Sequence, residues 1–134
     1  MSNNDDGERR PPEALLPLTP AVFHILLALA DGEKHGYAIM QEVEARTEGA
    51  MRMGPGTLYG SIQRMLKDGL IVEVQERADP VHHEERRRYY RLTTFGQRVV
   101  QAEARRLEQL IRIAQSKQVL PGFGMIASGM RGGA

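Results

Sequence analysis

Cysteine and tryptophan are both absent from the 134 residues of the sequence. A chain without cysteine forms no disulfide bonds and offers no thiolate ligands to a metal, which fits a reducing compartment. Four Tyr and three Phe leave little material for a platform on which single-stranded bases stack. These absences exclude disulfides and thiolate metal sites, and they argue against a protein that binds single strands.

Long apolar runs are missing too. The longest extends only from 25 to 30, far too short to span a bilayer, and no secretory signal opens the chain. We therefore expect a cytoplasmic protein without a membrane partner. The formal charge of +1 is close to neutral, so a nucleic-acid binder of this composition has to concentrate its positive charge locally.

Motifs for catalysis and metal binding are not found either. The run from His82 to Glu85 resembles a set of metal ligands, but adjacent histidines in a strand point to opposite faces, and no third ligand is spaced to join them. No glycine-rich phosphate loop or nucleophile motif appears. The chain is also short for an enzyme with its own cleft. We predict neither an enzyme nor a bound metal or cofactor.

The most informative stretch that is present extends from Gly54 to Leu70. Gly54, Pro55 and Gly56 predict a turn, and Thr57 then serves as the N-cap or as a first-turn residue of a short helix. Gly69 is placed to end that helix in a left-handed conformation. Four apolar residues share one helical face: Leu58, Ile62, Met65 and Leu66.

The opposite face of this helix carries hydroxyls, an amide and two cations: Tyr59, Gly60, Ser61, Gln63, Arg64 and Lys67. Arg and Gln side chains can hydrogen-bond to base edges in a DNA major groove, while Ser, Tyr and Lys can hold phosphates. The alternative is an ordinary solvated face, as most amphipathic helices have. The surrounding sequence favours the DNA interpretation.

Two further helices are predicted before this one. The first begins at Thr19-Pro20, a capping residue followed by proline, and is closed by Asp31-Gly32. The second begins near His35-Gly36-Tyr37 and ends at Glu48-Gly49. Three helices joined by short turns are typical of the helix-turn-helix plan.

A two-stranded β-wing is predicted after Gly69. The β-branched run from Leu70 to Val74 indicates a strand, the polar segment from Gln75 to Glu85 a hairpin loop, and the run from Arg86 to Leu92 the return strand. The return strand is basic, so Arg86, Arg87 and Arg88 are candidates for contacts with phosphate or the minor groove. The alternative is an edge strand protected by charge.

A long helix is predicted from Thr93 or Thr94 to Gln118. Its apolar residues follow the spacing of a heptad seam, which suits burial against the same helix and the first helix of a second copy. The alternative is packing back on its own first helix. The candidate dimerisation residues are Phe23, Val100, Ala104, Leu107, Leu110, Ile111 and Ala114.

The predicted fold is therefore mainly α with a small two-stranded β-wing: a winged helix-turn-helix followed by a long dimerisation helix. We divide the chain into a flexible N-terminal tail (1–17), the winged-helix domain (18–92), the dimerisation helix (93–118) and a flexible C-terminal tail (119–134).

These pieces together resemble the PadR-type transcriptional regulators. The resemblance covers about Leu18 to Ala114, and the combination of its motifs is specific although each alone is weak. The matching segments are Leu18-Thr19-Pro20 with Ile25-Leu26-Leu27, His35-Gly36-Tyr37-Ala38-Ile39, Gly54-Pro55-Gly56-Thr57-Leu58-Tyr59, Asp68-Gly69-Leu70-Ile71, and Arg88-Tyr89-Tyr90-Arg91-Leu92-Thr93 with Gly96.

The resemblance implies a homodimer that binds double-stranded DNA at a near-palindromic operator and represses transcription, with one C-terminal dimerisation helix. It implies a small-molecule effector at the dimer core. A winged helix that contacts only other proteins is the alternative. Residues that the resemblance places at or near DNA are Tyr37, Thr57, Tyr59, Ser61 and Arg64, with Arg87 and Arg88 in the wing.

Overall fold

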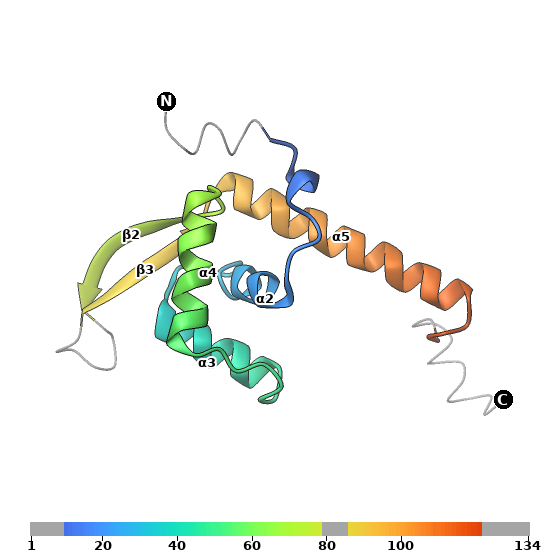
Figure 1. The fold of residues 1–134 in the computed structure, drawn as a ribbon, viewed down its shortest axis with the longest axis horizontal. Helices are drawn as coiled ribbons and strands as arrows, with labels where there is room; N and C mark the ends of the chain where they lie inside the picture. The colour runs from blue at the N-terminus through green and yellow to red at the C-terminus, as the bar shows by residue number, and fades with distance from the viewer. Residues whose placement is uncertain (1–9, 79–85, 122–134) are drawn as a thin grey trace. The chain divides into compact units, whose positions relative to one another are not determined.

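The computed structural model describes residues 10–78 and 86–121. Contacts divide the chain into two compact units, Met1–Glu103 and Ala104–Ala134. In chain order the elements are η1 (Pro12–Leu15), α2 (Pro20–Ala28), β1 (Lys34–His35), α3 (Gly36–Arg46), α4 (Pro55–Lys67), β2 (Ile71–Ala78), β3 (Arg86–Leu92) and α5 (Thr94–Ser116) (Figure 1).

The first two helices begin at the residues predicted for them, and both starts are capped. Thr19 Oγ1 accepts a hydrogen bond of 3.2 Å from the amide of Val22, and Pro20 is the first residue of α2. His35 Nδ1 accepts a hydrogen bond of 3.1 Å from the amide of Ala38 at the start of α3. α2 ends at Ala28, a few residues before the predicted Asp31-Gly32 turn.

The helix predicted in the central stretch is α4. Its N-cap is Gly54, so Pro55 and Gly56 already belong to the helix and Thr57 is a first-turn residue. Gly69 follows the C-cap with φ of +76°, the left-handed conformation predicted for it. Leu58, Ile62 and Met65 are fully buried, while Leu66 is half-buried.

The predicted two-stranded wing is formed by β2 and β3, and a short third strand, β1, pairs with β3 so that the antiparallel sheet has the order β1-β3-β2. β1 pairs Lys34 with Tyr90 and His35 with Tyr89. A strand of two residues shows no alternation in the sequence, so pattern analysis passes over it. β2 also continues to Ala78, beyond the predicted end of the strand. The rest of the predicted hairpin loop, with the His82–Glu85 cluster, lies outside the described residues.

The chain before α2 packs against the core of the first unit. Leu15, Leu16 and Leu18 are partly buried on it. The guanidinium of Arg10 donates a 2.9 Å hydrogen bond to the carbonyl of Asp68, at the end of α4. These contacts place the segment from 10 to 18 beside the C-terminal end of α4.

A tight junction joins the start of α5 to the end of α4. Thr93 Oγ1 accepts a 2.9 Å hydrogen bond from the amide of Gly96 and donates one of 2.6 Å to the carbonyl of Gly69. A Cβ on Gly96 would meet the backbone of Leu70, lying 2.9 Å from its carbonyl carbon and closer still to the oxygen. Only glycine permits this approach of the two backbones.

The second unit contains the remainder of α5. Leu110, Ile111 and Ile113 are all exposed there, and Leu107 and Ala114 are half-buried. Within the described ranges, no helix has the length and apolarity needed to cross a bilayer.

The junction generates a matched pair of predictions on helical glycines. Replacing Gly96 by Ala should lower the free energy of unfolding by about 2 kcal/mol or more, because backbone atoms must move apart. Replacing Gly60 of α4 by Ala should raise the free energy of unfolding by about 0.5–1 kcal/mol through helix propensity, because a Cβ there would meet nothing within 4 Å. Urea unfolding at fixed protein concentration measures both. Equal effects of the two changes would contradict the close approach.

Candidate nucleic-acid interface

The outward side of α4 is fixed by the burial of its apolar side. Because Leu58, Ile62 and Met65 are locked in the core, the opposite side must face solvent. We define the α4 face as the exposed residues on that side: Thr57, Tyr59, Gly60, Gln63, Arg64 and Lys67. It combines two cations with hydroxyl and amide groups, and none of its residues is acidic.

Ser61 does not belong to this face, although the sequence analysis placed it there. It is only 1% exposed, and its Oγ accepts a 3.4 Å hydrogen bond from Arg64. At 100° per residue, position 61 lies on the flank of the stripe formed by Leu58 and Met65. The small side chain of serine fits against the core there. A helical wheel places position 61 beside the apolar stripe, so its burial could be predicted from the sequence, although serine is polar.

The N-terminus of α4 is a feature that the sequence analysis missed. Its N-cap Gly54 provides no side-chain hydrogen bond, and both Gly54 and Gly56 adjoin open space. The first turn of α4 is exposed from Gly54 to Thr57, and the helix dipole adds positive potential at this end. The signal in the sequence is a glycine in the position that Ser, Thr, Asp or Asn usually fills.

Tyr59 packs against the start of α3. A Cβ on Gly36 would lie 2.6 Å from the Tyr59 hydroxyl oxygen, so glycine is what allows the ring to sit there while remaining 42% exposed. Burial, and next the carboxylate of Glu73, raise the pKa of Tyr90, and the nearby Tyr59 raises it further. Tyr59 therefore packs α4 against the start of α3.

Arginines of β3 extend the cationic surface into the wing. The guanidinium of Arg87 lies over the ring of Tyr37, 5.5 Å from its centroid, and Tyr37 is 43% exposed at the start of α3. Arg88 is exposed and pairs with Glu73 at 3.4 Å. Arg86 belongs to β3, but its side chain is not among those described. Tyr37 and Arg87 are thus brought together from segments 50 residues apart.

The candidate dimerisation residues divide between the two units. Phe23 is half-buried in α2, and Val100 is buried in the first part of α5. The remaining candidates, all in the second unit, are Ala104, Leu107, Leu110, Ile111 and Ala114. Across the described residues, no group of three or more His, Cys, Asp or Glu is arranged to hold a metal ion.

Comparison with known proteins finds transcriptional regulators among the relatives. Residues 25–102 match the model of the "Transcriptional regulator PadR-like family". The transcriptional regulator Rv3488 of Mycobacterium tuberculosis is 38% identical over 90 residues, which cover 67% of this chain and 78% of the relative. The family match covers α3, α4 and all three strands, with the end of α2 and the start of α5.

Two solved structures share the fold at lower sequence identity. A PadR family transcription regulator from Clostridium difficile is 20% identical, with a TM-score of 0.61 over 75% of this chain and 99% of that one. Bacillus subtilis PadR, solved in complex with operator DNA, is 19% identical, with a TM-score of 0.54 over 64% of this chain. The match covers only 47% of the Bacillus protein.

The burial of Ser61 leads to a stability prediction. Replacing Ser61 by Gln should lower the free energy of unfolding by about 1–3 kcal/mol, because the larger side chain overpacks the core. The reverse exchange at exposed Gln63, Gln63→Ser, should change it by no more than about 0.5 kcal/mol. Urea unfolding compares the two variants. A Ser61→Gln variant as stable as the parent would place Ser61 on the surface after all.

Proposed function

The chain belongs to the PadR-like family of transcriptional regulators, and from this membership we propose that it is a repressor that binds a near-palindromic operator as a homodimer. A transcriptional regulator of this family is not an enzyme. The observation that carries the proposal is the α4 face, a cationic and amide-bearing surface on a helix whose other side is locked in the core.

In this proposal α4 enters the major groove. Gln63 and Arg64 hydrogen-bond to base edges, since amide and guanidinium groups match the pattern of donors and acceptors there. Thr57, Tyr59 and Lys67 hold phosphates, as do the backbone amides in the exposed first turn of α4. Ser61 is left out because it is buried. Bacillus subtilis PadR, a protein of similar fold, was solved in complex with operator DNA, which supports DNA as the partner.

The wing contacts the DNA beside α4. Arg86, Arg87 and Arg88 supply its positive charge, and Tyr37 supports Arg87 from below through the cation–π contact. A guanidinium that is already held over a ring loses less conformational freedom when it binds a phosphate. In the proposal, Tyr37 therefore positions the side chain of Arg87 and also faces the DNA.

The homodimer is formed by α5 and α2. Exposed Leu110 and Ile111 lie on the same helix as half-buried Leu107, and water-exposed apolar side chains of this size are covered in stable proteins. Phe23 of α2 joins the interface. Two copies then present their α4 helices about one helical turn of DNA apart, roughly 34–36 Å.

A small-molecule effector at the dimer core releases the repressor. A ligand that binds one arrangement of the two subunits more tightly shifts the population towards it. If that arrangement moves the two α4 helices out of register with the operator, the affinity for DNA falls by a factor set by the coupling free energy between the effector and DNA sites.

The α4 face gives the first test of this function. Arg64→Ala should weaken binding to the DNA upstream of the protein's own gene by about 1–3 kcal/mol, and binding to a scrambled duplex much less, if Arg64 contacts a base. Fluorescence anisotropy across a salt series measures both affinities.

Arg98→Ala is the matched control, since Arg98 is an exposed arginine of α5 outside the proposed interface. An equal loss on both duplexes would make Arg64 a phosphate contact instead. If the parent protein binds neither duplex even at low salt, the chain is a protein-interaction module and the proposal fails.

The seam of α5 gives the second test. Replacing Leu107 and Ile111 together by Glu should yield a monomer, because two charges would be buried in an apolar interface. Sedimentation velocity of the full chain measures the mass. The control, Gln101→Glu with Gln109→Glu, adds the same charge at exposed positions of α5 away from the seam and should leave the dimer intact. A dimer that survives the seam substitutions would rule out this interface.

A further inference from the structure

The segment before α2, residues 10–18, is held to the first unit at both of its ends, and we call it the N-terminal segment. The backbone amide of Leu18 donates a 2.8 Å hydrogen bond to the carboxylate of Glu103, a residue of α5 that is only 1% exposed. At the other end, Arg10 donates a 2.9 Å hydrogen bond to the carbonyl of Asp68. Apolar side chains between these two points pack against the core. The fold therefore fixes the place of Arg10.

One guanidinium contacts both the end of α4 and the start of α5. Besides its hydrogen bond to Asp68, the guanidinium of Arg10 lies over the ring of Phe95, 5.6 Å from the ring centroid. Asp68 is the C-cap of α4, and Phe95 is the second residue of α5. A cation at the C-terminal end of a helix meets carbonyl groups that lack partners within the helix, and it meets the negative end of the helix dipole. Arg10 thus bridges α4 and the first turn of α5.

Part of the Arg10 guanidinium is buried. Its Nε is inaccessible to solvent and has no hydrogen-bond partner within the described residues. A surface arginine usually keeps its charged head in water, and burying a donor without a partner raises the free energy of the folded state. A side chain buried in this way is placed by contacts within the protein. This geometry suits a role in holding α4 and α5 rather than in binding a phosphate.

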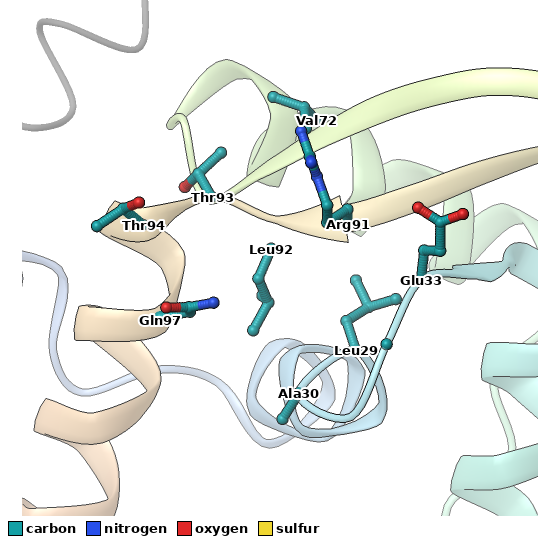
Figure 2. Close-up of a pocket in the computed structure, with 10 residues that line it drawn as sticks. Leu29, Ala30, Glu33, Val72, Arg91, Leu92, Thr93, Thr94 and Gln97 are labelled. Carbon is teal, nitrogen blue, oxygen red and sulfur yellow. The ribbon is translucent and has the colours of Figure 1, made fainter.

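The first turn of α5 borders a pocket on the side that faces the end of α2. The pocket has a volume of about 530 Å³, and Figure 2 shows Thr94 and Gln97 of α5 at one of its walls. Side chains that border a pocket lack protein contacts on that side, and such contacts are what fixes an element in a close-packed interior. The position of this turn therefore depends on its other contacts, which include the approach to the backbone of Leu70 and the contact between Phe95 and Arg10.

The N-terminal segment also lies beside Arg64, the residue proposed to contact a base. A second pocket of about 180 Å³ lies between them, and its lining includes Leu15, Arg64 and Asp68. Side-chain tips lie about 5–6 Å from a helix axis, so a rotation of α4 by about 20° moves them by about 2 Å. Hydrogen bonds to base edges vary in length by only about 0.5 Å. A contact that prevents such a rotation therefore keeps Arg64 aligned with the bases.

We propose that Arg10 is a positioning residue for DNA recognition: it holds the end of α4 against the first turn of α5 and so fixes the place of Arg64 in the major groove. Arg10 itself contacts no DNA. The inference rests on the function proposed above, and it adds a residue that belongs neither to the α4 face nor to the wing. Its contribution is to sequence recognition and not to the neutralisation of phosphates.

The test compares Arg10→Met with the parent chain on the DNA upstream of the protein's own gene and on a scrambled duplex. The variant should bind the first duplex about fivefold more weakly or worse, and the second within about twofold of the parent, because only the alignment of a base contact is lost. The slope of log affinity against log salt should stay unchanged. Arg10→Lys, which keeps the charge and a donor for the carbonyl of Asp68, should lose less specificity. Fluorescence anisotropy across a salt series measures all of these.

Arg98→Met is the matched control, because it removes the same charge from an exposed position of α5, and it should leave both affinities unchanged. An equal loss on both duplexes with a smaller salt slope would make Arg10 a phosphate contact and overturn the proposal. An Arg10→Met variant that unfolds at lower urea but keeps the specificity of the parent would overturn it too, since Arg10 would then only stabilise the fold. A parent that binds neither duplex would refute the proposed function together with this inference.

Hydrogen exchange tests the same contact without DNA. The amides of Asp68 and Gly69 close the last turn of α4 through hydrogen bonds to the carbonyls of Arg64 and Leu66. In Arg10→Met both amides should exchange about fivefold faster or more, because opening of this turn no longer breaks the bond to Arg10. Amides of α3 should exchange as in the parent and serve as the internal control. NMR of the ¹⁵N-labelled full chain measures both, and equal exchange at the end of α4 in the two proteins would overturn the proposal.

Discussion

The contact between the backbones of Leu70 and Gly96 is the constraint on which the rest of the first unit depends. α4 ends just before Leu70 and β2 begins just after it, while β3 ends and α5 begins just before Gly96. Thr93 fastens the same junction by bonding to the carbonyl of Gly69. The helix that carries the proposed base contacts, both strands of the wing and the long helix therefore all start or end within a few residues of one another.

A second close approach sets the other end of the interface. Gly36 lets the ring of Tyr59 rest on the start of α3, and one residue later Tyr37 lies under the guanidinium of Arg87. α3 thus contacts α4 through its first residue and the wing through its second. The proposed interface is preorganised because α4 and the wing both pack against the start of α3, and preorganisation lowers the entropic cost of binding.

The sequence predicts those features whose signals are local. The cap Thr19 and the terminating glycine Gly69 each act within one turn of a helix, and the structure has both where they were expected. Ser61 and the strand β1 differ because tertiary packing decides them. A serine on the flank of an apolar stripe is buried only if a neighbour covers it, and β1 exists only because β3 lies alongside. The approaches at Gly36 and Gly96 join distant segments, so no window of sequence contains them.

A chain of net charge +1 can bind DNA only if its carboxylates are kept away from the bound surface. The structure pairs several carboxylates with arginines, Glu42 with Arg46, Glu44 with Arg52 and Glu73 with Arg88, while the α4 face has no acidic residue. Even so, each copy offers few cations, and affinity for the DNA backbone grows with the number of phosphates neutralised. In the proposed complex, one copy therefore neutralises only a few phosphates. A dimer formed through α5 doubles the number of phosphate contacts, so the proposed dimer and the proposed DNA surface support one another.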